Sequence, residues 1–173
     1  MKIRFGPAGI PLSCKGRTLK DGIRDVANLN LNAMEIQLIR AVGSNIDNLK
    51  EIGKIADQLD VKLSVHAPYY MDFAGNKETI ERSIENLKWS GVLAHEMKAE
   101  LVNTHVALYG NNSKKGTLEK VVENVRTVRD WYKKQKLKPI IGLETSGHQK
   151  VFGSVDEILA VCKRVSNTAP VLN

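Results

Sequence analysis

Two histidines and one glutamate stand at the ends of short apolar segments. His66 ends the apolar part of KLSVHAPYY, His105 follows that of AELVNTHVALYG, and Glu144 closes that of PIIGLETSG. Two imidazoles and a carboxylate are a common ligand set for a divalent metal ion. A carboxylate within an apolar strand also requires a partner, such as a metal ion or an arginine. We therefore predict one metal site from these three residues, although a lone histidine at a strand end is more often a hydrogen-bonded structural residue.

The metal site requires that the three segments be neighbouring strands. Short apolar runs alternate with helical periodicity through the whole chain. Strands are expected at residues 3–5, 33–39, 62–66 and 139–147. Another strand is expected within residues 99–110, with His105 after it, and a sixth begins at 169–173. Helical patterns lie between them, and the last one starts with a capping box, SVDE. Because parallel strands lie about 4.8 Å apart, side chains at matching strand ends can converge on one ion.

The alternation of strands and helices predicts an α/β fold with parallel strands and right-handed crossovers. Two layouts fit, a doubly wound open sheet and an eight-stranded barrel, and both place function at the C-terminal ends of the strands. The first turn, GPAGIPLSCKG, lacks the GxGxxG pattern of dinucleotide-binding sheets. A flavodoxin-like sheet remains open. No linker is visible, so residues 1–173 are expected to form a single domain.

The composition favours an anionic partner and a reducing compartment. The chain of 173 residues has a net charge of +7, which suits nucleic acid or a phosphorylated substrate, or reflects a generally lysine-rich surface. Cys14 and Cys162 lie far apart and form no CxxC pattern, which argues against a disulfide framework and a zinc ribbon. No apolar run reaches the roughly 18 residues of a membrane span. A cytoplasmic protein without membrane contact is expected.

Two further charged residues are given structural interpretations. His95 and Glu96 begin like the HExxH metal motif, but Ala99 stands where the second histidine would be. His95 is therefore expected to be a solvated helix residue. Glu35 lies inside the strand expected at 33–39, where it either points into a barrel centre or pairs with a buried cation. We prefer the ion pair.

Three motifs carry a resemblance to a known family. SVHAPYY, LVNTHVALYG and GLETSG occur in this order on consecutive expected strands. The sequence thereby resembles the endonuclease IV family of apurinic/apyrimidinic endonucleases. This family lies in the TIM-barrel group that includes xylose isomerase-like sugar isomerases and epimerases. The resemblance implies a TIM-type (β/α) barrel, incomplete in this chain, with about five to six of eight βα units. It also implies hydrolysis of double-stranded DNA at abasic sites, in base excision repair, with up to three Zn²⁺ ions; Mn²⁺ is an alternative.

The resemblance also implies roles for individual residues. His66 and His105 would bind one zinc, and Glu144 would bridge it to a second and serve in catalysis. The residues implied to contact DNA are Tyr69, Tyr70, Arg40 and His148. Tyr69 matches an aromatic residue that inserts into the duplex, or it packs over a loop. His148 is a possible phosphate donor or a solvated loop histidine.

The sequence departs from the family pattern at its C-terminal end. Asn173 falls where the family has a zinc-binding aspartate, and the later ligands are absent, so one zinc has a full protein ligand set. A fragment of a longer protein, or self-association that covers an open barrel edge, would explain this. Two other functions stay open. One is a sugar-phosphate isomerase or epimerase with one metal and an acid/base pair, and the other is a non-catalytic metal- or DNA-binding remnant.

Overall fold

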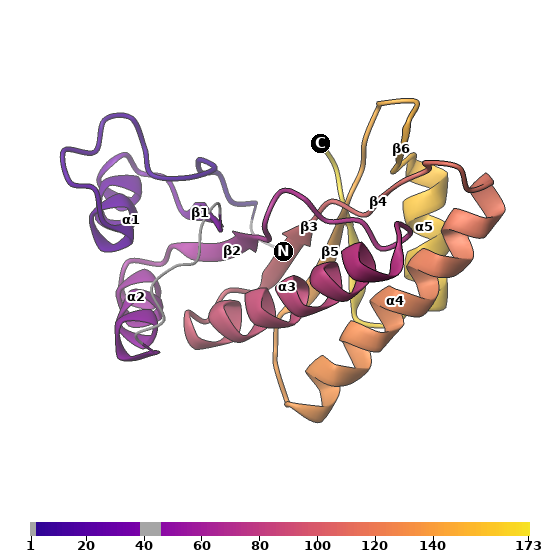
Figure 1. The fold of residues 1–173 in the computed structure, drawn as a ribbon. Coiled ribbons are helices and arrows are strands. Elements are labelled where there is room, and N and C mark those ends of the chain that lie inside the picture. Colours follow the sequence, from indigo (N-terminus) through magenta and orange to yellow (C-terminus); the bar gives the residue numbers. More distant parts are fainter. Residues whose placement is uncertain (1–2, 39–45) are drawn as a thin grey trace.

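The computed structural model describes residues 3–38 and 46–173 (Figure 1). Its helices and strands follow one another along the chain in the alternation expected from the sequence. They are α1 (Leu19–Asn28), β1 (Ala33–Gln37), α2 (Ile46–Gln58), β2 (Lys62–His66), α3 (Lys77–Glu96), β3 (Leu101–Thr104), β4 (Ala107–Leu108), α4 (Lys114–Lys134), β5 (Ile140–Glu144), β6 (Val151–Phe152), α5 (Val155–Arg164) and β7 (Thr168–Val171).

The five longer strands form one parallel sheet in the order β1-β2-β3-β5-β7. The order along the sheet is the order along the chain, as the progression of elements in Figure 1 shows. With right-handed crossovers, this order places every connecting helix on the same face. A doubly wound sheet would reverse its order at a switch point. The sheet is therefore part of a TIM-type (β/α) barrel, and the fold class predicted from the sequence is confirmed.

The strand predicted for residues 3–5 is not a regular strand. The chain there lies beside β1, where the carbonyl oxygen of Phe5 accepts a hydrogen bond from Ala33 N and that of Pro7 accepts one from Glu35 N, both at 3.0 Å. Pro7 has no N–H group to give in return. The segment therefore pairs with the barrel sheet without completing a ladder.

The strand predicted within residues 99–110 is β3, and the same segment also forms the short strand β4. β3 ends at Thr104, and β4 leaves the barrel sheet to pair antiparallel with β6. The carbonyl oxygen of Val106 there accepts a hydrogen bond from Phe73 N at 3.0 Å, which ties this turn to the β2–α3 loop. His105 thus sits between two strands, at the point where the chain leaves the sheet.

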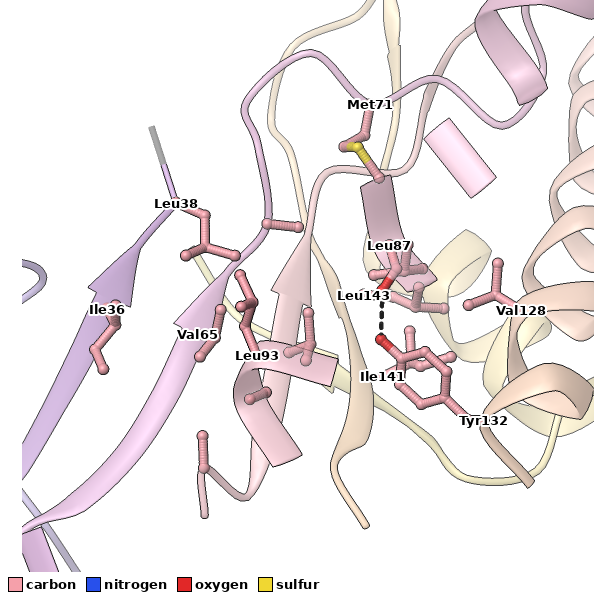
Figure 2. Packing of buried hydrophobic residues seen from close by; sticks show 14 of the residues in the cluster. Ile36, Leu38, Val65, Met71, Leu87, Leu93, Val128, Tyr132, Ile141 and Leu143 are labelled. Carbon is pink, nitrogen blue, oxygen red and sulfur yellow. Dashed lines mark hydrogen bonds between the residues drawn. The ribbon is translucent and has the colours of Figure 1, made fainter. Parts of the chain in front are cut away.

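The hydrophobic core lies between the sheet and its helices. Alternate residues of β1 and β2 are buried, for example Ile36 and Val65, because strand side chains point in turn to opposite faces. Figure 2 shows part of this core, in which the Tyr132 hydroxyl donates a hydrogen bond to the Leu87 carbonyl oxygen at 2.6 Å. This bond joins α4 to α3 within the buried layer.

Among the residues that the structure describes, Glu35 has no ion-pair partner and accepts a hydrogen bond from Gln37 Nε2 at 2.7 Å, so its ion pair stays a prediction. The interpretation of His95 needs correction. His95 is half-buried, and its Nδ1 accepts a hydrogen bond from Lys138 N at 3.2 Å, so it is not simply solvated. The capping box predicted at Ser154 is confirmed.

None of the helices in the described part of the chain combines the length and the apolar character needed to cross a membrane.

Candidate metal site

The structure brings His66, His105 and Glu144 together at the carboxyl-terminal edge of the barrel sheet. Their ligand atoms all lie within 4.8 Å of one another. His66 Nε2 is 2.9 Å from Glu144 Oε2, and the imidazole rings of His66 and His105 have centroids 5.2 Å apart. Three side chains that are far apart in the sequence thus form one cluster.

The register of the sheet explains why these side chains meet. His66 on β2 stands opposite Asn103 on β3, and Asn103 stands opposite Gly142 on β5. Glu144 follows Gly142 by two residues on the same face of β5, and His105 directly follows the end of β3, so both lie just beyond the level of His66. The parallel arrangement of β2, β3 and β5 therefore places all three ligands at one edge.

The His66 ring is oriented by the backbone of the following residue. Its Nδ1 lies 2.8 Å from the carbonyl oxygen of Ala67. Since a carbonyl only accepts hydrogen bonds, Nδ1 carries a proton and Nε2 is directed at Glu144. Metal-binding histidines are held in the same way, with the second ring nitrogen donating to a carbonyl or carboxylate. A cation bound by both side chains would lie between Nε2 and the Glu144 carboxylate.

The electrostatics of the cluster also suit a cation. The side chain of Glu144 is only 6% exposed, which leaves it dependent on nearby donors. Asn103 Nδ2 donates to Glu144 Oε2 at 2.7 Å, and Asn173 Nδ2 donates to Glu144 Oε1. Burial lowers the pKa of His105, an effect opposed by the negative charge of Glu144 and reinforced by His66. A lower pKa favours the neutral imidazole, which is the form that binds metals.

The donor set fits zinc or manganese. Ligands about 2.1 Å from a tetrahedral ion lie roughly 3.4 Å from one another, so the cluster needs only a modest contraction around the ion. Three protein ligands with an open fourth position are typical of catalytic rather than structural zinc sites. His66, His105 and Glu144 would thus hold the ion and leave room for a substrate. That they bind a metal stays a prediction.

An open cleft of about 790 Å³ adjoins the cluster. His105, Thr145 and Asn173 line it on the sheet side, and Tyr69 and Tyr70 line it from the β2–α3 loop. The Tyr69 ring packs edge-on against His105, with centroids 4.8 Å apart, yet the residue remains 70% exposed. The volume lies within the range of small-molecule sites, roughly 300–1,000 Å³.

The other predicted site residues have varied positions. Tyr70 is 88% exposed and contacts Tyr69, with ring centroids 5.5 Å apart. His148 is exposed in the loop after β5 and also lines the cleft. Arg40 lies outside the described residues. Asn173 reaches Glu144 with its amide group, so this side chain acts as a hydrogen-bond donor to the cluster.

Sequence reasoning missed Asn103. It lies on the inner face of β3, two residues before His105, and is 4% exposed. The available signal was an asparagine within the otherwise mostly apolar segment LVNTHVAL. Such a residue needs a partner when it is buried, and the structure shows that the partner is Glu144.

With the fold and the cluster established, the chain can be compared with known proteins. The profile of a family described as xylose isomerase-like TIM barrel matches residues 23–172. The chain belongs to this family. Among curated proteins, it is 28% identical over 159 residues to an uncharacterized protein of Methanocaldococcus jannaschii, covering 91% of this chain and 56% of that protein. The chain therefore spans little more than half the length of this relative.

Solved structures of sugar epimerases share the fold. The D-psicose 3-epimerase of Clostridium cellulolyticum H10, crystallised with D-tagatose, superposes with a TM-score of 0.74 at 17% identity, covering 91% of this chain and 58% of that one. The 3-keto-D-glucoside 4-epimerase of E. coli gives 0.76 at 9% identity, with 99% and 68% covered. A D-tagatose 3-epimerase-like protein gives 0.74 at 20% identity, with 98% and 64% covered.

These comparisons refine the resemblance seen in the sequence. They support the wider group, the xylose isomerase-like TIM barrels, and do not support endonuclease IV specifically. At identities of 9–20% a likeness to solved structures shows the fold alone. Since one barrel fold supports many reactions, the function of this chain has to be argued from its site.

Proposed function

We propose that the protein is a divalent-metal-dependent isomerase or epimerase of a sugar or sugar phosphate. The observation that carries this proposal is the cluster of His66, His105 and Glu144 beside a cleft of small-molecule size. The fold shared with sugar epimerases supports it. Because the chain spans 58–68% of the structures described above, the activity of the whole protein is itself part of the proposal.

The chain's own residues suggest how such a reaction would proceed. A bound divalent ion would polarise a sugar carbonyl, which makes the neighbouring C–H group more acidic. We assign to Glu144 the acceptance of that proton. Its return to the adjacent carbon gives an isomer, and delivery of a proton to the opposite face of the same carbon by a second acid gives an epimer. His66 and His105 hold the ion, and the exposed Tyr69 ring offers an apolar face against which a sugar ring can pack.

Exchange of substrate hydrogen with solvent tests this proposal directly. The purified chain would be loaded with Mn²⁺, Co²⁺ or Zn²⁺ and incubated in D₂O with a panel of ketoses, aldoses and their phosphates. We expect metal-dependent incorporation of deuterium next to the carbonyl, detected by NMR, and its loss in His105→Ala. A metal-loaded chain that exchanges no hydrogen with any panel member would contradict the proposal.

A second candidate is a nuclease that acts at abasic sites in double-stranded DNA. The net charge of +7 and the exposed pair Tyr69 and Tyr70 beside the metal cluster favour it. Aromatic side chains can enter a base stack, and lysines can bind the phosphates. Metal-dependent nicking of an abasic duplex, weakened at least tenfold by Tyr69→Ala, would establish this function instead. Metal binding without turnover of either substrate would indicate a binding protein.

A further inference from the structure

We propose that Asn103 and Asn173 form an amide clamp that fixes the carboxylate of Glu144 in the orientation needed to bind the metal. Asn103 is the principal positioning residue of this clamp. The inference rests on the proposed metal site. It assigns a positioning role to Asn103, which belongs to no metal-ligand set, and to Asn173, which stands where the resembled family has a metal-binding aspartate. It also makes the site dependent on β3 and on the segment after β7 as well as on the ligands.

The contacts of Glu144 define the clamp. Asn103 Nδ2 donates to Oε2 at 2.7 Å, and Asn173 Nδ2 donates to Oε1 from the opposite side of the cluster. One amide therefore holds each carboxylate oxygen, and rotation of the carboxylate about its terminal bond would break both hydrogen bonds. Asn173 is itself held, because its backbone N–H donates to Thr145 Oγ1 at 3.0 Å.

The clamp leaves one direction free for a cation. Oε2 has two lone pairs, one of which accepts from Asn103 while the other faces His66 Nε2 at 2.9 Å. With the Asn103 bond in place, that second lone pair stays directed at His66. The clamp therefore sets the direction in which Glu144 meets an ion held by the histidines.

The unused half of the Asn103 amide indicates a functional rather than a structural role. Its Oδ1 is buried and has no hydrogen-bond partner among the residues that the structure describes. The amide cannot turn around to relieve this, because a carboxylate requires the Nδ2 donor. A buried acceptor without a partner is costly for folding, and an apolar side chain of similar shape would avoid the cost. Such local conflicts are expected at functional sites.

The experiment separates fold stability from metal affinity. Asn103→Leu has a similar shape but removes the donor, and Asn173→Ala removes the other donor at an exposed position. The matched control is Asn124→Leu on α4, where Asn124 Nδ2 donates to the Phe73 carbonyl oxygen at 2.8 Å, away from Glu144. Each variant of the full chain would be titrated with Co²⁺ by calorimetry and visible spectroscopy, and unfolded by urea in EDTA.

We expect Asn103→Leu to bind Co²⁺ about 10–100-fold more weakly with an altered visible spectrum. Its metal-free unfolding midpoint should change little, because relief of the unpartnered Oδ1 offsets the loss of one donor to Glu144. Asn173→Ala should weaken binding by a smaller factor. Asn124→Leu should lower the unfolding midpoint and leave the affinity unchanged.

Three results would overturn the inference, and they have different meanings. If the unmodified chain binds Co²⁺ and the two clamp variants bind it equally well with the same spectrum, the clamp is wrong while the metal site stands. If the unmodified chain binds no Co²⁺, the proposed function fails together with the clamp. Should Asn103→Leu fail to fold, Asn103 is structural and the clamp is again wrong.

Discussion

The two faces of the barrel sheet have opposite chemical character. The face toward the helices is apolar and buried, whereas the inner face carries polar side chains that converge at one edge. Leu143 and Glu144 show the contrast most directly, since adjacent residues of β5 serve the core and the candidate site. Because strand side chains alternate, one short segment supplies both stability and chemistry. Substitutions on the two faces should therefore have separable effects.

The largest expected effect lies on the face toward the helices. Leu143→Ala removes a fully buried side chain and leaves a cavity, so we expect the free energy of unfolding to fall by about 2–5 kcal/mol. Urea denaturation followed by circular dichroism measures this loss. At low temperature, where the variant is folded, its Co²⁺ affinity should match that of the unmodified chain. A variant that keeps its stability would show that the helix face does not carry the fold.

The second-largest expected effect concerns Glu144, the residue that follows Leu143. Glu144→Gln keeps the shape of the side chain and removes the charge, so metal affinity should fall by about 100-fold or more. The free energy of unfolding without metal should change by less than about 1 kcal/mol, because Gln keeps one acceptor oxygen and the amide of the exposed Asn173 can turn to accept from the new NH2 group. Calorimetric titration and urea denaturation give both values. Comparable losses of stability and metal affinity would contradict the expectation that substitutions on the two faces of the sheet have separable effects.

A polar group on the helix side should affect stability alone. Tyr132 is almost fully buried, and its hydroxyl donates to the Leu87 carbonyl oxygen. Removing that bond in Tyr132→Phe should cost about 1 kcal/mol. Differential scanning calorimetry would detect the lower melting temperature. A change in Co²⁺ affinity would reveal coupling between the helix layer and the site.

The smallest effect concerns pH. Burial holds the pKa of His105 below its ordinary value in the folded chain, so the unfolded chain binds more protons between the two pKa values. In EDTA, stability should therefore be lost as pH falls below the unfolded value of about 6.5, through the folded pKa. His105→Asn should reduce this slope. Urea midpoints measured between pH 5 and 7.5 test it, and an unchanged slope in the variant would remove His105 as the cause.

Much of the fold followed from local patterns. The strand predicted at 62–66 matches β2, and those predicted at 33–39 and 139–147 contain β1 and β5. Residues 99–110 contain β3, which ends just before His105 as predicted. The short strand β4 was not predicted, because the apolar pattern does not reveal that the chain turns away at His105 to form it. The strand at 3–5 was wrong because Pro7 interrupts the ladder that the apolar residues suggested.

Local sequence patterns also predicted part of the candidate site. His66, His105 and Glu144 could be found because each stands at the end of an apolar run. Asn103 could not be assigned a role, since its partner Glu144 lies on another strand. The motifs suggested endonuclease IV, whereas the comparisons support the broader xylose isomerase-like group. Residues at a shared metal-binding edge do not by themselves define the reaction.

The sequence by itself determined which side chains face the helices and which face the opposite side, because the two-residue period of a strand is a local property. It also determined that the polar residues stand at strand ends. Only the tertiary structure decided that β2, β3 and β5 are neighbours in a barrel order, and that His66, Asn103 and Glu144 therefore touch. Strand order depends on how distant segments pack, and the same local alternation is compatible with both a barrel and an open sheet.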